Sequence, residues 1–123
     1  MDFTGAVEQH LAAVAARDLP AYLATVRDDV SLILLNGRLL RGREAVAGLH
    51  QDWFADPDWS WTLSPVHSAV AGDTGVAVFE VDYHDLDGDG KPYSARYLLS
   101  LTFTRDSDGW RLLHDQNTAL PSD

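Results

Sequence analysis

Hydrophobic positions follow two different periods along this chain, helical in the first half and strand-like in the second. Apolar residues recur every three or four positions in three early segments, which predicts three helices. Thr4 and Asp18 are placed to cap the first two helices, and Pro20 fits the first turn of the second. The predicted helices cover residues 4–17, 19–27 and 43–55.

Beyond residue 58 the apolar residues alternate with polar ones, as in strands buried on one face. Turns rich in glycine and aspartate separate four such strands, over residues 59–71, 76–84, 93–104 and 109–118. Asn36–Gly37 predicts an earlier hairpin, because this dipeptide is typical of a two-residue β-turn. Pro65 lacks the N–H that an inner strand donates, so its strand is predicted to bend or to lie at an edge.

The order of these elements predicts an α+β fold in a single domain spanning residues 1–123. About six strands form a mainly antiparallel sheet, and the three helices of the N-terminal half pack on one of its faces. That face is predicted to be apolar. Its residues on the two central strands are Ala77, Phe79, Val81 and Tyr83, then Ala95, Tyr97, Leu99, Leu101 and Phe103.

The last strand starts with apolar residues and ends with polar ones, which is typical of a strand that lines a pocket. Strict alternation places Trp110, Leu112, His114 and Gln116 on the helix-covered face, and Arg111, Leu113, Asp115 and Asn117 on the other. A closed, mainly apolar pocket with a few polar groups is how proteins bind small molecules. Imidazole titrates near neutral pH, so His114 is the candidate catalytic proton carrier. The alternative is a core histidine satisfied by one hydrogen bond.

Further pocket residues are predicted on the helices and on the two preceding strands. An aromatic stripe of this kind is also typical of an ordinary core, and that alternative stays open. His10, at the edge of the first helix's apolar stripe, is predicted to face solvent. The full set of predicted ligand-pocket residues is Tyr22, His50, Trp53, Tyr83, Tyr97 and Gln116.

Composition narrows the possible partners. A net charge of −10 and a single lysine, Lys91, predict that the chain binds neither nucleic acid nor an anionic membrane. Cysteine is absent, which excludes disulfides and cysteine-ligated zinc. We see no signal peptide and no run of about 20 apolar residues, and expect a cytoplasmic protein.

No cofactor or metal is expected from the motifs. Asp85–Gly90 opens like a calcium-binding loop, but the twelfth position, where a bidentate glutamate belongs, is Arg96. A polar hairpin loop is the better interpretation. The five histidines are dispersed along the chain without the spacing of a metal site.

Four segments in this order resemble the nuclear-transport-factor-two-like superfamily, and within it the SnoaL-like and SgcJ/EcaC groups of small bacterial proteins. They are Ala16–Tyr22, Asp28–Val30, Gly42–Val46 and Gly109–Asp115. The resemblance implies a cone-shaped fold with three helices on the concave face of a curved, mixed sheet. It also implies a pocket between them and a homodimer, for which we expect the outer sheet face to be used.

Members of that superfamily include ketosteroid isomerases, polyketide cyclases, dehydratases, epoxide hydrolases and non-catalytic binding or association modules. We therefore expect a pocket for a small hydrophobic or polyketide-like molecule. The expected chemistry is cofactor-free cyclisation, isomerisation or dehydration, and the alternative is a non-catalytic ligand-binding or dimeric association module.

The chain departs from the ketosteroid isomerases at one point. The strand that carries their acidic base corresponds here to Leu32–Leu35, which has no carboxylate. Epoxide hydrolase relatives use an Asp-Arg-Asp set, and Asp82, Arg96 and Asp115 are candidates to meet across neighbouring strands. Alternation puts these three on the face away from the helices, where a surface ion-pair network is the better interpretation.

Overall fold

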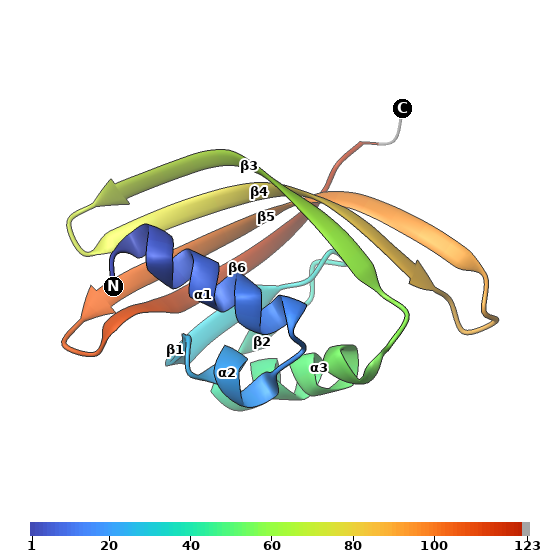
Figure 1. The fold of residues 1–123 in the computed structure, drawn as a ribbon, viewed down its shortest axis with the longest axis horizontal. Coiled ribbons are helices and arrows are strands. Elements are labelled where there is room, and N and C mark those ends of the chain that lie inside the picture. Colours follow the sequence, from blue (N-terminus) through green and yellow to red (C-terminus); the bar gives the residue numbers. More distant parts are fainter. Residues whose placement is uncertain (122–123) are drawn as a thin grey trace.

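A long, curved sheet wraps over three helices, which lie on its concave side (Figure 1). The computed structural model describes residues 1–121. Within them the helices are α1 (Phe3–Ala15), α2 (Leu19–Leu23) and α3 (Arg43–Ala55). The strands are β1 (Val26–Ile33), β2 (Leu39–Arg41), β3 (Ser60–Ala71), β4 (Thr74–Leu86), β5 (Pro92–Asp106) and β6 (Gly109–Ala119). The predicted α+β class, with three helices on one face of a curved, mixed sheet of six strands in this described part, is confirmed.

The strand order in the sheet is β2-β1-β6-β5-β4-β3. Neighbouring strands are antiparallel except β1 and β6, which run parallel and make the sheet mixed. β3 lies at the edge, as Pro65 predicted, and its register with β4 shifts between Pro65 and His67. An edge position removes the need for a proline N–H, and a bulge bends the strand locally.

Two predicted helix boundaries are wrong. α1 is capped by Asp2, whose Oδ1 accepts a hydrogen bond from the N–H of Gly5 at 2.8 Å, and not by Thr4. This earlier start brings Phe3 into the helix and under the sheet. Asp28 and Asp29 do not end the second helix, because they lie inside β1. Asp18 caps α2 as predicted, accepting from the N–H of Ala21 at 3.0 Å.

The core lies where α1 packs against the C-terminal part of β5 and the N-terminal part of β6. Phe103 and Leu112 are fully buried there, and the ring of Phe3 meets that of Phe103 edge-on, with centroids 5.8 Å apart. The buried face of α1 repeats every three or four residues. It consists of Phe3, Ala6, Val7, His10, Ala13 and Val14.

Gly75 provides the room for the ring of Phe3 at the start of β4. A Cβ atom at this position would lie 2.5 Å from two carbons of that ring. We expect Gly75→Ala to lower the free energy of unfolding by about 1–3 kcal/mol, the usual cost of overpacking a core. Urea unfolding followed by tryptophan fluorescence measures the change. Gly48→Ala, at a helical site where nothing lies within 4 Å of the added carbon, is the control and should not destabilise.

The helices of the described chain are all short. None of them within residues 1–121 has the length and apolar character needed to cross a membrane.

Candidate functional site

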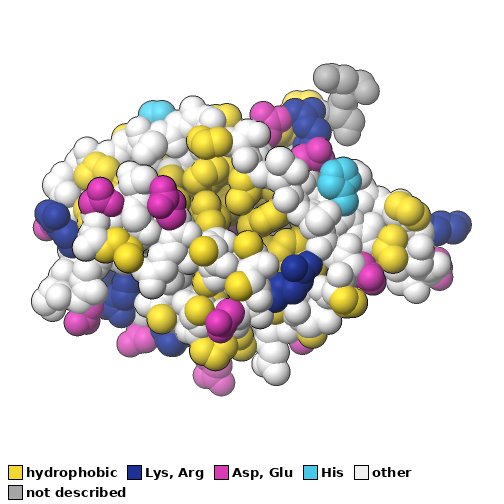
Figure 2. All heavy atoms as spheres, in the orientation of Figure 1, with side chains coloured by type: hydrophobic (Ala, Val, Ile, Leu, Met, Phe, Trp, Pro, Cys, Tyr) yellow, Lys and Arg dark blue, Asp and Glu magenta, His cyan; other side chains and the backbone are white. Residues whose placement is uncertain are grey.

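A cavity of about 440 Å³ lies between the concave face of the sheet and the helices. Hydrophobic side chains gather at the hollowed centre of the face shown in Figure 2. The size is in the range that binds drug-sized molecules. Its lining residues are His10, Leu11, Val14, Tyr22, Leu32, Leu34, Leu35, Asn36, Leu49, His50, Trp53, Trp61, Tyr83, Tyr97, Leu99, Asp115 and Asn117.

The polar residues that β6 presents to this cavity are not the predicted ones, because the strand has the opposite face turned inward. Thr102 pairs with His114, but the next residue of β5, Phe103, pairs with Leu112, so Leu113 has no partner in the ladder. One extra residue in a strand exchanges its two faces from that point onward. Asp115 and Asn117 therefore point inward, opposite Leu101 and Leu99 of the apolar face.

The inward placement of His114 and Gln116 was therefore wrong. Gln116 is exposed, and His114 lies on the outer face, where its Nδ1 is 2.7 Å from the hydroxyl of Ser31. Neither residue lines the cavity. His114 thus lacks the position from which a proton-carrying role was predicted.

Asp115 is the acid of the cavity. Its side chain is buried, with the residue 7% exposed, and Oδ1 accepts a hydrogen bond of 2.9 Å from Nδ2 of Asn117. The same Nδ2 donates to the carbonyl oxygen of Ile33 at 2.9 Å, which fixes the amide between β6 and β1. Burial disfavours the charged carboxylate and raises the pKa of Asp115 to about 7, against a smaller opposing effect of the Asn117 hydrogen bond.

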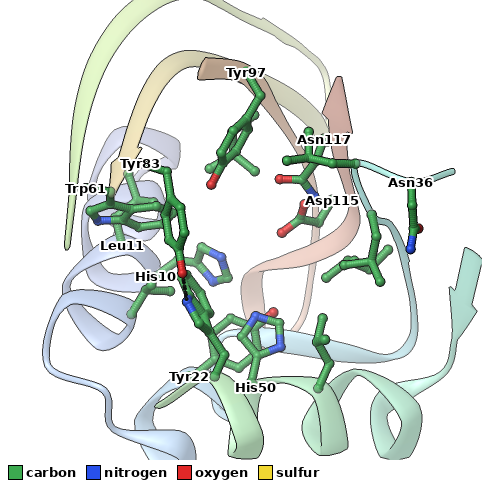
Figure 3. Close-up of a pocket in the computed structure, with 17 residues that line it drawn as sticks. His10, Leu11, Tyr22, Asn36, His50, Trp61, Tyr83, Tyr97, Asp115 and Asn117 are labelled. Carbon is green, nitrogen blue, oxygen red and sulfur yellow. Dashed lines mark hydrogen bonds between the residues drawn. The ribbon is translucent and has the colours of Figure 1, made fainter. Parts of the chain in front are cut away.

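Tyr22 and Tyr97 line the cavity together with this acid. Tyr97 and Asp115 point into the space above the ring of His50 (Figure 3). Burial, and then the nearby Asp115 charge, raise the pKa values of both Tyr22 and Tyr97. Both phenols therefore keep their protons and can donate hydrogen bonds. The buried hydroxyl of Tyr22 has no hydrogen-bond partner within residues 1–121.

Two buried histidines flank Tyr22. The ring of His50 stacks on that of Tyr22 at a centroid distance of 4.0 Å, and the ring of His10 lies 5.0 Å from it. Burial lowers the pKa of His50 to about 4. Burial and the second histidine together lower the pKa of His10 to about 3. Both rings are neutral at pH 7. The prediction that His10 faces solvent was wrong, since this residue is 2% exposed.

Aromatic rings form one wall of the cavity. Trp53 stacks on Trp59 with centroids 4.3 Å apart and lies edge-on to Trp61 at 5.4 Å. The indole N–H of Trp53 donates to the hydroxyl of Tyr83 at 3.1 Å, and that hydroxyl donates to Oδ2 of Asp85 at 2.8 Å. These bonds tie Trp53 of α3 to Tyr83 and Asp85 near the C-terminal end of β4.

The structure brings five of the predicted pocket residues to one cavity. They are Tyr22, His50, Trp53, Tyr83 and Tyr97. Sequence reasoning missed Asp115, Asn117 and His10. The spacing of His10 from Phe3, Val7 and Val14 was a usable signal, because three- and four-residue steps place it on the buried face of α1.

The Asp-Arg-Asp set does not assemble. Asp82 and Arg96 face each other across β4 and β5 on the outer side of the sheet, and Arg96 pairs with Glu80 there. Asp115 lies inside the cavity, on the opposite face. The Asp85–Gly90 segment includes the hairpin between β4 and β5, closed by the N–H of Asp87 donating to the carbonyl of Lys91 at 2.9 Å.

A family model described as the SnoaL-like domain matches residues 5–119. An uncharacterised protein with a cystatin-like fold from Caulobacter vibrioides matches with a TM-score of 0.83 and 19% identity, covering 98% of this chain and 88% of that one. A ketosteroid isomerase-like protein from Erwinia carotovora atroseptica has a TM-score of 0.80 and 16% identity, with 97% and 94% covered. The association domain of C. elegans CaMKII has a TM-score of 0.71 and 17% identity, with 94% and 92% covered. No curated protein sequence matches the chain.

Proposed function

The chain belongs to the SnoaL-like domain family, and from that premise we propose that it is a cofactor-free acid/base enzyme acting on a small hydrophobic molecule. Asp115 is the proposed proton carrier. Cyclisation, isomerisation and dehydration all require a proton to be taken from one atom and returned to another, and one carboxyl group can do both. The observation that carries this proposal is that Asp115, the one carboxyl group among the described residues that line the cavity, is buried in mainly apolar surroundings.

The protonation of Asp115 supports this role. A pKa of about 7 means that both its acid and its base forms are present at neutral pH. A general acid/base works best when its pKa lies near the working pH. Asn117 orients the carboxyl through its hydrogen bond, so that the other oxygen is left for a substrate.

The phenols supply the second requirement of such chemistry. Removing a proton next to a carbonyl develops negative charge on oxygen, which preorganised donors stabilise. Tyr97 and Tyr22 line the same cavity as Asp115 and stay protonated at neutral pH. The ketosteroid isomerase-like structure with the same fold also supports this class of reaction.

The pH dependence of proton abstraction tests the proposal. The probe is 5-nitrobenzisoxazole, a planar uncharged ring whose carbon-bound proton passes to a carboxylate as its N–O bond breaks, giving a coloured phenolate. We expect the rate to rise with pH and to level off, with a midpoint near 7, because only the ionised Asp115 accepts the proton. A midpoint near 4, typical of an exposed carboxylate, would contradict the role of a buried acid.

A second proposal concerns assembly, and the match to a CaMKII association domain favours it. We propose that the outer sheet face forms a homodimer, whether or not the cavity is catalytic. Val76, Val78 and Leu98 lie on that face, opposite Thr102, Ser100 and Glu80 in the ladder between β4 and β5, and each is only partly buried. A cluster of apolar side chains on a sheet face is typical of an interface between subunits.

Sedimentation equilibrium measures this assembly. We expect the wild-type chain to sediment as a dimer and Val78→Asp to sediment as a monomer, because a charge buried in an apolar interface has no partner. Ala45→Asp, on an exposed position of α3, should leave the dimer intact. A Val78→Asp variant that remains dimeric would show that another surface is used.

A further inference from the structure

Hydrogen bonds fix the proton of His10 on one of its two ring nitrogens. The hydroxyl of Thr25 donates its single proton to the carbonyl oxygen of Tyr22, at 2.6 Å. It can therefore only accept at its other contact, 2.7 Å from Nδ1 of His10. Nδ1 must carry the proton of the neutral imidazole, and Nε2 is left as a bare acceptor.

His50 has the same tautomer for a simpler reason. Its Nδ1 lies 2.8 Å from the carbonyl oxygen of Val46, which can only accept a hydrogen bond. Nδ1 therefore carries the proton, and Nε2, the ring nitrogen farther from the main chain, carries a lone pair. For the part of the chain that the structure describes, no hydrogen bond reaches Nε2 of His10 or of His50.

The cavity thus offers two hydrogen-bond acceptors, Nε2 of His10 and Nε2 of His50, but no positive charge from the described residues that line it. Among the described residues that line it, none is lysine or arginine, and both histidines are neutral at pH 7. An anionic ligand would lose its hydration without gaining a cation. Two imidazole acceptors on either side of the Tyr22 ring instead match a ligand that brings its own O–H groups.

We propose that the ligand of this cavity is an uncharged, hydroxylated ring compound whose O–H groups donate to Nε2 of His10 and Nε2 of His50. This inference rests on the proposed small-molecule function of the cavity and names its substrate class. The aromatic wall that includes Trp53, Trp61 and Tyr83 contacts the ring body of the ligand. The hydroxyl groups then determine which way the ring enters, with its other end directed at Asp115.

Three naphthalene probes that differ in one substituent test this inference by isothermal titration calorimetry. They are 2-naphthol, 2-methoxynaphthalene and 2-naphthoate at pH 7. We expect 2-naphthol to bind about 2- to 10-fold more tightly than its methyl ether, because its one O–H donates a hydrogen bond that the ether cannot make. The carboxylate should bind more weakly still. Equal affinities for 2-naphthol and its ether, or a preference for the carboxylate, would overturn the inference.

A matched pair of variants locates the effect. His50→Phe keeps a ring against Tyr22 but removes the acceptor, and should reduce the preference for 2-naphthol over its ether. His67→Phe makes the same replacement at an exposed histidine of β3 and should leave the preference unchanged. If His50→Phe retained the full preference and the Nε2 signal described below did not respond to 2-naphthol, the assignment to this acceptor would be wrong.

Long-range proton–nitrogen NMR of the wild-type protein gives a readout that needs no variant to fold. We expect both buried histidines to show a protonated Nδ1 and a bare Nε2 from pH 5.5 to 8, and 2-naphthol, but not its ether, to shift the Nε2 signals. A protonated Nε2 would overturn the inference while leaving the role of Asp115 untouched. Failure of every probe to bind would contradict the small-molecule cavity itself, and this inference with it.

Discussion

Replacing Asp115 by asparagine should slow the opening of 5-nitrobenzisoxazole by about 10²–10⁴-fold, the contribution typical of a positioned general base. Asparagine has nearly the same shape and can still accept the hydrogen bond from Asn117, so the cavity should keep its form. It has no site that takes up a proton at neutral pH. The measurement is the rate constant for the bound probe, from initial rates at saturating protein and pH 8.

Asp82→Asn is the control, because this carboxylate lies exposed on the outer face of the sheet. Its rate should equal that of the wild type. His114→Ala should also retain the wild-type rate, since His114 does not line the cavity. A fully active Asp115→Asn variant would remove this residue from the mechanism, and a loss of rate in His114→Ala would restore the sequence-based hypothesis.

The same substitution should make the protein more stable, and increasingly so as the pH rises. The pKa of Asp115 is about 7 in the folded chain, against an ordinary value of 3.8, which applies to the unfolded chain. Between these values the folded state holds a proton that the unfolded state has lost, so this group lowers stability as the pH rises from about 4 to 7. From pH 5 to pH 8 the loss amounts to about 3 kcal/mol, at about 1.4 kcal/mol per pKa unit.

Urea unfolding at pH 5 and pH 8, for the wild type and for Asp115→Asn, isolates this contribution. The stability gained by the variant should be larger at pH 8 than at pH 5 by about 3 kcal/mol. His10 and His50, whose pKa values are lowered, act in the opposite sense: the stability they contribute is lost as the pH falls below 6.5. Their effect is common to both proteins and cancels in the difference. A gain that did not change with pH would mean that Asp115 titrates normally.

The architecture could be predicted from the sequence because its elements have strong local periods. α3 has the predicted bounds, Arg43–Ala55, and the edge position of Pro65 followed from its missing N–H. The apolar face of β4 and β5 followed from alternation alone. These features depend on neighbouring residues, which a single sequence shows.

The inner face of β6 could not be predicted in the same way. Its orientation depends on a bulge at Leu113, and nothing local distinguishes that leucine from a regularly paired one. The bulge is determined by the partners on both sides, β5 and β1, which pair with β6 in opposite directions. A single unpaired residue thus exchanged His114 and Gln116 for Asp115 and Asn117 in the cavity. His10 differs, since the period of α1 already indicated its burial.

Within residues 1–121, β6 is the last strand, yet it lies in the middle of the sheet, between β1 and β5 (Figure 1). A nascent chain that has emerged from the ribosome only to residue 108 has the strands on both sides of β6, which are β1 with β2 and β3 to β5. It lacks β6, the strand that joins these two parts of the sheet. The strand that connects these two parts also carries Asp115. During synthesis, closure of the sheet and arrival of the acid are one event, so no shorter nascent chain has both the enclosed cavity and the carboxyl that would act within it.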